Sequence, residues 1–127
     1  MSKRILLRRF RRDESGATAA EYGLIMPLLI FGIFGALWAG LLMFSNSSLD
    51  LAVQAAARCM AVDADKCGSP SATETYALSQ YSGPNISPAF TATASGCGHT
   101  VTAEAKFDLG ILPGFADVPL STSACYP

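Results

Sequence analysis

The chain has 127 residues, which is enough for one modest domain, and half of these residues are hydrophobic. Its formal net charge of −1 hides an uneven distribution of basic residues. Six of the nine Lys and Arg residues stand within the first 12 positions: Lys3, Arg4, Arg8, Arg9, Arg11 and Arg12. Because the basic residues that nucleic-acid binding requires are confined to this leader, we predict no nucleic-acid partner for the rest of the chain.

Residues 23–44 form an uncharged apolar segment of 22 residues. A helix of this length rises about 33 Å, more than the roughly 30 Å hydrocarbon core of a bilayer, so we predict a transmembrane helix. One alternative is a buried helix of a soluble protein, but the 83 residues that follow are too few to cover it on all sides. The other is a secretory signal peptide, whose apolar stretch is normally about 7–15 residues long and ends at a small-x-small site. Ser45-Asn46-Ser47 is a weak match to such a site.

The basic leader should remain in the cytoplasm, which predicts a single pass through the membrane with the C-terminal domain on the far side. Four cysteines follow the apolar segment and would lie where disulfides persist: Cys59, Cys67, Cys97 and Cys125. They allow two bridges in three alternative pairings. A zinc site is a competing interpretation, but there is no C-x-x-C motif, and the sole histidine, His99, stands two residues from Cys97. We therefore predict no metal and no cofactor.

The helix is predicted to continue beyond the membrane. Apolar residues recur at three- and four-residue spacing up to about Val62: Leu49, Ala52, Val53, Ala56 and Met60. One long helix, transmembrane in its lower half and amphipathic in its upper half, accounts for both patterns. Residues 67–70 then turn the chain, and Ser71-Ala72-Thr73-Glu74 reads as a capping box that starts a short helix ending near Tyr81.

From Ala89 the hydrophobic period changes to two, which predicts half-buried strands. The residues predicted to face the core are Phe90, Ala92 and Ala94, then Val101, Ala103, Ala105, Phe107 and Leu109 after the turn at residues 96–98. A third strand is predicted from Val118 to Tyr126. The fold class is therefore α+β, a long N-terminal helix with a small disulfide-bonded cap that contains a short helix and an antiparallel sheet of about three strands.

This topology favours one pairing of the cysteines. If residues 99–109 and 118–126 form antiparallel neighbours, Cys97 and Cys125 meet at the same end of the ladder. Cys59 and Cys67 are eight residues apart, and a bridge between them is easy if the loop doubles back. We divide the chain into a basic cytoplasmic leader (1–16), a transmembrane and assembly helix (17–44) and an exported globular cap (45–127).

Glu21 stands at the edge of the apolar helix, where a carboxylate is a candidate functional residue or a side chain that extends into the lipid head groups. Residues 13–25, DESGATAAEYGLI, resemble the processing site of Flp-type pilins and pseudopilins of the Tad (tight adherence) pilus, a type IV pilus, where a prepilin peptidase cuts a G/xxxxE[FY] sequence. The resemblance implies cleavage after Gly16, with Ala17 as the new N-terminus, Glu21 as its fifth residue and Tyr22 completing the motif. The six basic residues leave with the leader.

The added β region and cysteines resemble a TadE/TadF-type minor pseudopilin rather than a short, nearly all-helical major pilin. The resemblance implies a bacterial structural subunit that is a prepilin peptidase substrate and that inserts in, or primes, the pilus through its N-terminal helix. Its implied partners are the peptidase, other pilin subunits, the inner-membrane assembly platform and, before assembly, membrane lipid. After assembly it would be extracellular, in a pilus used for adhesion.

Two features of the helix suit assembly. The α-amino group that cleavage exposes on Ala17 can pair with Glu21 of a neighbour or of the same subunit, which offsets a charge in an apolar bundle. Gly32, Ala36 and Gly40 form a small-xxx-small ladder that permits close helix packing, although Gly is also simply common in membrane helices.

No nucleophile elbow, P-loop or zinc-protease motif is present in the sequence, so we predict no enzymatic activity. The alternative function is an uncleaved single-pass membrane protein whose exported disulfide-bonded domain binds a partner or acts as a scaffold. The two functions differ in whether residues 1–16 are cleaved from the chain.

Overall fold

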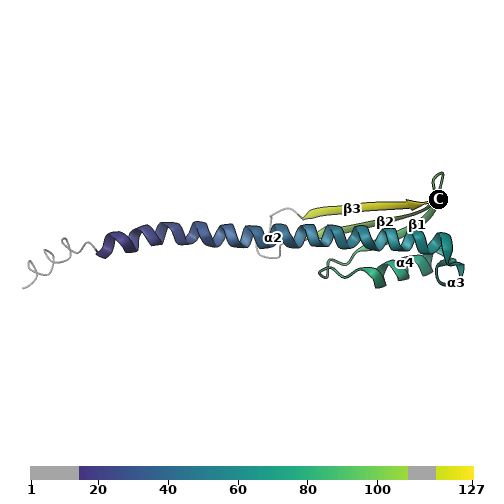
Figure 1. The fold of residues 1–127 in the computed structure, drawn as a ribbon, viewed down its shortest axis with the longest axis horizontal. Helices are drawn as coiled ribbons and strands as arrows, with labels where there is room; N and C mark the ends of the chain where they lie inside the picture. The colour runs from purple at the N-terminus through teal and green to yellow at the C-terminus, as the bar shows by residue number, and fades with distance from the viewer. Residues whose placement is uncertain (1–14, 109–116) are drawn as a thin grey trace, which may run out of the picture. The chain divides into compact units, whose positions relative to one another are not determined.

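The computed structural model describes residues 15–108 and 117–127. The elements in chain order are α2 (Ser15–Val62), α3 (Ala64–Cys67), α4 (Pro70–Gln80), β1 (Ala89–Ser95), β2 (Gly98–Phe107) and β3 (Val118–Tyr126), as shown in Figure 1. This confirms the predicted α+β class, with one long N-terminal helix, short helices and a three-stranded antiparallel sheet. Residues 1–14 of the predicted leader and the predicted strand residue Leu109 lie outside the described residues.

The chain divides into an N-terminal unit, residues 1–38, and a C-terminal unit, residues 39–127, and helix α2 contributes to both. In the described part of the N-terminal unit, the helix continues through Pro27. Its large apolar side chains are exposed, among them Leu24 at 80% and Phe31 at 76%. The most apolar 18-residue window of α2 has no buried residue, and the helix is long and apolar enough to cross a membrane. A buried core helix of a soluble protein does not have such an exposed surface.

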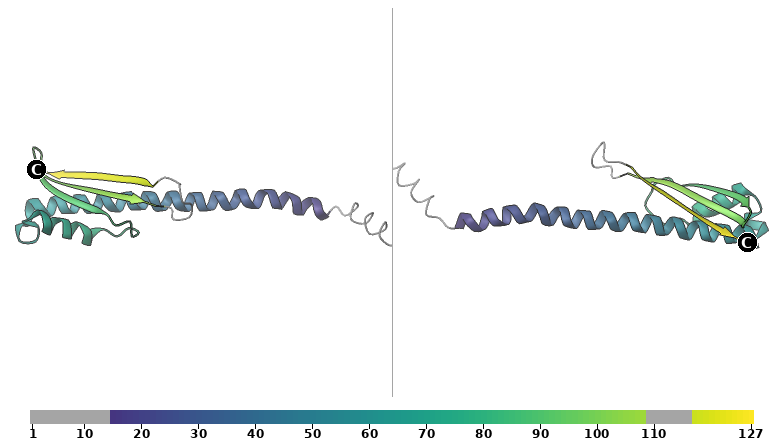
Figure 2. Two further views of the ribbon diagram at one scale, coloured as in Figure 1. Left: turned by 180° about the vertical axis from the view of Figure 1, so that it is seen from behind. Right: turned by 90° about the horizontal axis from the view of Figure 1, so that it is seen from above.

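The core of the C-terminal unit lies between α2, α4 and one face of the sheet. Figure 2 shows the strands lying alongside the C-terminal part of α2. Helix α2 contributes its predicted apolar stripe, in which Leu49, Ala52, Val53 and Ala56 are fully buried. Met60, the last residue of that stripe, is half-buried. The spacing of three and four residues therefore located the face of the helix that packs on the sheet.

The strands are ordered β1-β2-β3, and both pairings are antiparallel. The predicted alternation is confirmed in β2, where Val101, Ala103, Ala105 and Phe107 are buried. In β1, Phe90 and Ala92 are buried, but Ala94 is exposed, so its assignment to the core was wrong. Ala94 pairs with His99 next to the β1–β2 turn, at the end of the sheet.

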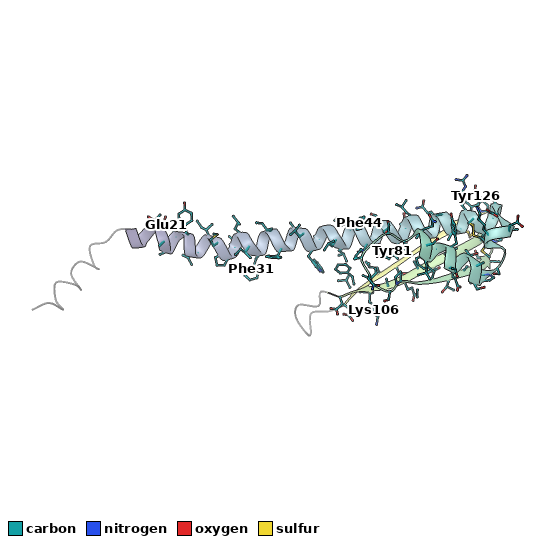
Figure 3. All side chains as sticks on the ribbon, turned by 90° about the horizontal axis from the view of Figure 1, so that it is seen from below. Glu21, Phe31, Phe44, Tyr81, Lys106 and Tyr126 are labelled. Atoms are coloured by element: carbon teal, nitrogen blue, oxygen red, sulfur yellow. A yellow bond between two sulfur atoms is a disulfide. The ribbon has the colours of Figure 1, made fainter. Side chains whose placement is uncertain are left out.

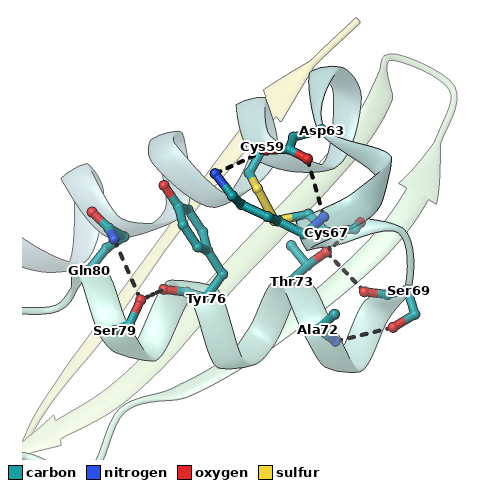
Figure 4. The surroundings of a disulfide bond; sticks show 10 residues. Cys59, Asp63, Cys67, Ser69, Ala72, Thr73, Tyr76, Ser79 and Gln80 are labelled. Atoms are coloured by element: carbon teal, nitrogen blue, oxygen red, sulfur yellow. Dashed lines mark hydrogen bonds and ion pairs between the residues drawn. A yellow bond between two sulfur atoms is a disulfide. The ribbon is translucent and has the colours of Figure 1, made fainter.

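Helix α4 begins two residues earlier than the capping box predicted. Its N-cap is Ser69, whose Oγ accepts a hydrogen bond from the Ala72 amide at 3.3 Å, and Pro70 occupies the first helical turn. Figure 4 shows this contact beside the first disulfide. Proline at the first position fits the helix start because the missing N–H has no partner there in any case. The predicted box is wrong because the cap lies at Ser69, so Glu74 stands inside the helix, where it accepts a hydrogen bond from the Ala92 amide of β1 at 3.2 Å.

We expect Ser69→Ala to destabilise the C-terminal unit by about 1 kcal/mol, because the Ala72 amide loses its capping acceptor. Ser71→Ala is the comparison variant: Ser71 is exposed and is not the cap, although its hydroxyl lies 3.3 Å from the Ser69 Oγ, and we expect it to change stability by less than about 0.5 kcal/mol. Urea unfolding of the full-length chain in detergent micelles measures both. A larger loss for Ser71→Ala would show that the sequence-predicted cap is the correct one.

Hydroxyl groups connect the elements of the C-terminal unit. The Ser48 Oγ accepts a hydrogen bond from the Ser82 amide at 3.0 Å, which joins α2 to the segment after α4. The Thr122 hydroxyl of β3 donates to Asp50 Oδ1 of α2 at 3.1 Å. The Tyr81 hydroxyl donates to the Pro84 carbonyl at 2.8 Å, and burial raises the pKa of this phenol. The first two bonds join α2 to the segment after α4 and to β3 within the C-terminal unit.

Candidate processing and assembly site

The predicted processing residues lie in the first two turns of α2, which begins at Ser15. Gly16 and Glu21 are exposed, and Tyr22 is 64% exposed. Figure 3 shows Glu21 at the surface of the helix. A Cβ added to Gly16 would meet no atom within 4 Å, so the fold of this chain does not itself require glycine at that position.

The position of the Gly16–Ala17 bond favours access by another protein. The bond lies in the first turn of the described helix, close to its N-terminal end. Glycine also stabilises a helix less than other residues do, by roughly 1 kcal/mol relative to alanine. A peptidase that binds an extended backbone can therefore open this end while the rest of α2 stays helical.

Glu21 follows Ala17 by four residues, which places the two on the same helical face one turn apart. A free amino group at residue 17 would stand at the N-terminus of the helix, where the macrodipole disfavours positive charge. A carboxylate one turn away offsets part of that cost. The spacing alone supports this pairing, and it remains a prediction for the cleaved chain.

The three predicted helix-packing residues, Gly32, Ala36 and Gly40, are all exposed on α2. A Cβ at Gly32 or Gly40 would meet no atom within 4 Å. No contact within the described residues therefore requires small side chains at these two positions. Their role in packing against another helix remains a prediction.

The four cysteines form the two predicted disulfides. Cys59 and Cys67 join the end of α2 to the end of α3, with 5.7 Å between their Cα atoms, as shown in Figure 4. Cys97 and Cys125 join the β1–β2 turn to the end of β3, with 6.5 Å between their Cα atoms. Because all four sulfurs are in disulfides, none is a thiolate that could bind zinc.

Sequence reasoning missed a groove between α2 and the end of β3. It has a volume of about 510 Å³ and is lined by Leu51, Gln54, Ala55, Ala57, Arg58, Ala124, Cys125 and Tyr126. The signal available in the sequence was Leu51, an apolar residue that lies two positions from Leu49 and off the predicted stripe. In the structure its side chain is exposed. The sequence did not show which strand would stand beside that side chain.

The fold thus defines a class: an apolar helix able to span a membrane, continuous with the helix of a small disulfide-bonded α+β unit. Residues 16–58 match the family model described as TadE-like protein, a segment that contains every predicted processing and packing residue. This match confirms the resemblance stated from the sequence: the segment 16–58 is TadE-like, which supports a Tad pilus-associated membrane protein. Comparison with curated proteins and with solved structures gives no match.

Proposed function

We propose that the chain is a structural minor pseudopilin of a Tad-type pilus, without enzymatic activity of its own. A prepilin peptidase cuts it after Gly16, and its N-terminal helix then inserts in the pilus or primes its assembly. The observation that carries the proposal is the Gly16–Tyr22 motif, with Gly16, Glu21 and Tyr22 exposed, at the start of an apolar helix inside the segment that matches the TadE-like model. Its partners are the peptidase, other pilin subunits and the inner-membrane assembly platform.

The orientation follows from charge and redox chemistry. Six basic residues precede the motif, and positively charged flanks are retained in the cytoplasm. Both disulfides belong to the C-terminal unit, and disulfides persist outside the reducing cytoplasm. Together these features support a single pass, with the leader inside and the disulfide-bonded unit outside the inner membrane.

Cleavage changes the charge at the N-terminal end of the helix. It removes the six basic residues and leaves one amino group at Ala17, close to Glu21. Before cleavage, the leader charges hold the chain at the lipid surface and oppose its transfer into an apolar bundle. After cleavage, the exposed apolar side chains of α2 can leave lipid and pack against other helices without carrying those charges.

The alternative function is an uncleaved single-pass membrane protein with an exported scaffold or binding domain. The test is to express the chain with and without a Tad prepilin peptidase and to measure the intact mass and N-terminal residue of the membrane-bound product. We expect Ala17 as the N-terminus only when active peptidase is present. A persistent Met1 or Ser2 start beside active peptidase would establish the uncleaved alternative.

A Gly16→Leu variant should block cleavage completely, because the added side chain stands at the cut bond. Gly23→Leu is the matched control: this exposed glycine lies in the same helix, one residue past the motif, and an added Cβ there meets no atom within 4 Å. We expect the control to be cut as the wild type is. Equal loss of cleavage in both variants would attribute the effect to the helix rather than to the processing site.

A further inference from the structure

The two disulfides of the C-terminal unit differ in their access to solvent. Cys59 is 7% exposed and Cys67 has no exposed surface, whereas Cys97 and Cys125 are both exposed. A thiolate breaks a disulfide by direct attack on one of its sulfur atoms, so the rate depends on access to that sulfur. Thiols in solution can therefore reach the Cys97–Cys125 bridge of the folded chain, while the Cys59–Cys67 bridge is shielded.

Two hydroxyl groups lie against one sulfur of the exposed bridge. The Ser95 Oγ lies 3.0 Å from the Cys97 Sγ, and the Thr100 Oγ1 lies 3.4 Å from the same atom. Because a disulfide sulfur carries no proton, the hydroxyls are the donors. The Ser95 and Thr100 oxygens are 2.7 Å apart. The two shortest contacts therefore form a chain, in which Thr100 donates to Ser95 and Ser95 donates to Cys97.

The described residues offer no such donor to the other sulfur. Within residues 15–108 and 117–127 no hydrogen bond reaches the Cys125 Sγ, although Thr100 stands opposite Cys125 in the β2–β3 ladder. A negatively charged sulfur accepts stronger hydrogen bonds than a neutral one, and a chain of hydroxyls strengthens each bond in it. The hydroxyls thus stabilise a thiolate at Cys97 more than one at Cys125. In thiol–disulfide exchange, the more stable thiolate is the better leaving group.

We propose that the Cys97–Cys125 bridge is a thiol–disulfide exchange site for a dithiol reductant, with Cys125 as the attacked sulfur and Cys97 as the leaving group. The incoming thiolate bonds to the Cys125 Sγ, the disulfide bond breaks, and its electron pair goes to the Cys97 Sγ beside the Ser95 hydroxyl. The second thiolate of the reductant then displaces Cys125. The reductant is oxidised to a disulfide, and the two cysteines take up protons and become thiols.

The effect of exchange on the fold is local. The bridge joins the β1–β2 turn to the end of β3, and Figure 1 shows the C-terminus beside that turn. Thr100↔Cys125 and His99↔Tyr126 are the last pairs of the β2–β3 ladder. Opening the bridge therefore releases the end of β3 and leaves the Cys59–Cys67 bridge closed. This inference goes beyond the proposed function and does not depend on cleavage after Gly16.

The first test compares the two bridges in the oxidised full-length chain, in detergent micelles without denaturant. The chain is treated with dithiothreitol at mildly alkaline pH and blocked with N-ethylmaleimide at successive times, and peptide mass spectrometry identifies the blocked cysteines. We expect the Cys97–Cys125 bridge to open at least about tenfold faster, because the other bridge needs local unfolding to be reached. A smaller difference, or earlier opening of the Cys59–Cys67 bridge, would overturn the proposal.

The second test identifies the attacked sulfur. Glutathione is a monothiol and leaves a mixed disulfide on the sulfur that it attacks. With rapid blocking at the earliest times, we expect glutathione on Cys125 and maleimide on Cys97. Glutathione chiefly on Cys97, or equally on both cysteines, would contradict the assigned leaving group.

Variants at Ser95 test the donor. Ser95→Ala should slow the opening of the Cys97–Cys125 bridge by dithiothreitol about fivefold, because the leaving thiolate loses a charge-assisted hydrogen bond. Ser95→Thr keeps a hydroxyl and should retain the wild-type rate. Ser123→Ala is the matched control, since Ser123 is exposed on β3 and its hydroxyl makes no hydrogen bond in the part of the chain that the structure describes.

The sign of the Ser95→Ala effect separates this role from a structural one. A loosened end of the sheet would expose the bridge further and speed its opening, whereas loss of the donor slows it. An unchanged or faster rate in Ser95→Ala, or an equal slowing in Ser123→Ala, would therefore overturn the proposal.

Discussion

Replacing Cys97 and Cys125 together with serine is expected to destabilise the C-terminal unit by about 3.5 kcal/mol. The bridge joins residues 28 positions apart, and it stabilises the fold chiefly by restricting the unfolded chain. Both cysteines are exposed, so serine introduces no buried hydroxyl at either position. Urea unfolding of the full-length chain in detergent micelles, followed by near-UV circular dichroism, gives the loss in the free energy of unfolding.

The single variants Cys97→Ser and Cys125→Ser provide the control for this prediction. Either substitution removes the same bridge. Each single variant should therefore lose about as much free energy of unfolding as the double variant, and the two losses should not add. Additive losses would show that the two cysteines act separately and that the described pairing is incorrect. All samples need an oxidising buffer, because a reductant would also open the Cys59–Cys67 bridge.

The second large effect is expected at Leu49, the largest fully buried side chain of α2. Leu49→Ala should destabilise the C-terminal unit by about 3 kcal/mol, since it removes apolar contacts and leaves a cavity between α2 and the sheet. Leu51→Ala is the matched control on the same helix. Leu51 is 66% exposed, and we expect its truncation to change stability by less than about 0.5 kcal/mol.

The same pair of leucines tests the described packing of α2. The same urea titration measures both variants, and equal losses at Leu49 and Leu51 would contradict the described packing of α2.

Much of the processing site could be predicted because a peptidase reads consecutive residues. Gly16, Glu21 and Tyr22 form a linear motif, and the structure adds that they are exposed at the start of α2. The disulfide pairing could also be predicted from the sequence, because a short loop brings one pair of cysteines together and an antiparallel ladder brings the other pair together. Cleavage and helix packing depend on other molecules, so they remain predictions to be measured.

The sequence by itself determined the long helix, the three strands and most of their buried residues, because hydrophobic spacing is a local property; Ala94, at the end of the sheet, is the exception. Tertiary structure decided matters that depend on distant neighbours. Glu74 lies inside α4, where its carboxylate accepts a hydrogen bond from the Ala92 amide of β1, and the helix is capped by Ser69 instead. This contact gives a partner to a backbone amide at the edge of β1. Backbone hydrogen bonds are available at every residue, and only the arrangement of the strands decides which of them stay unpaired.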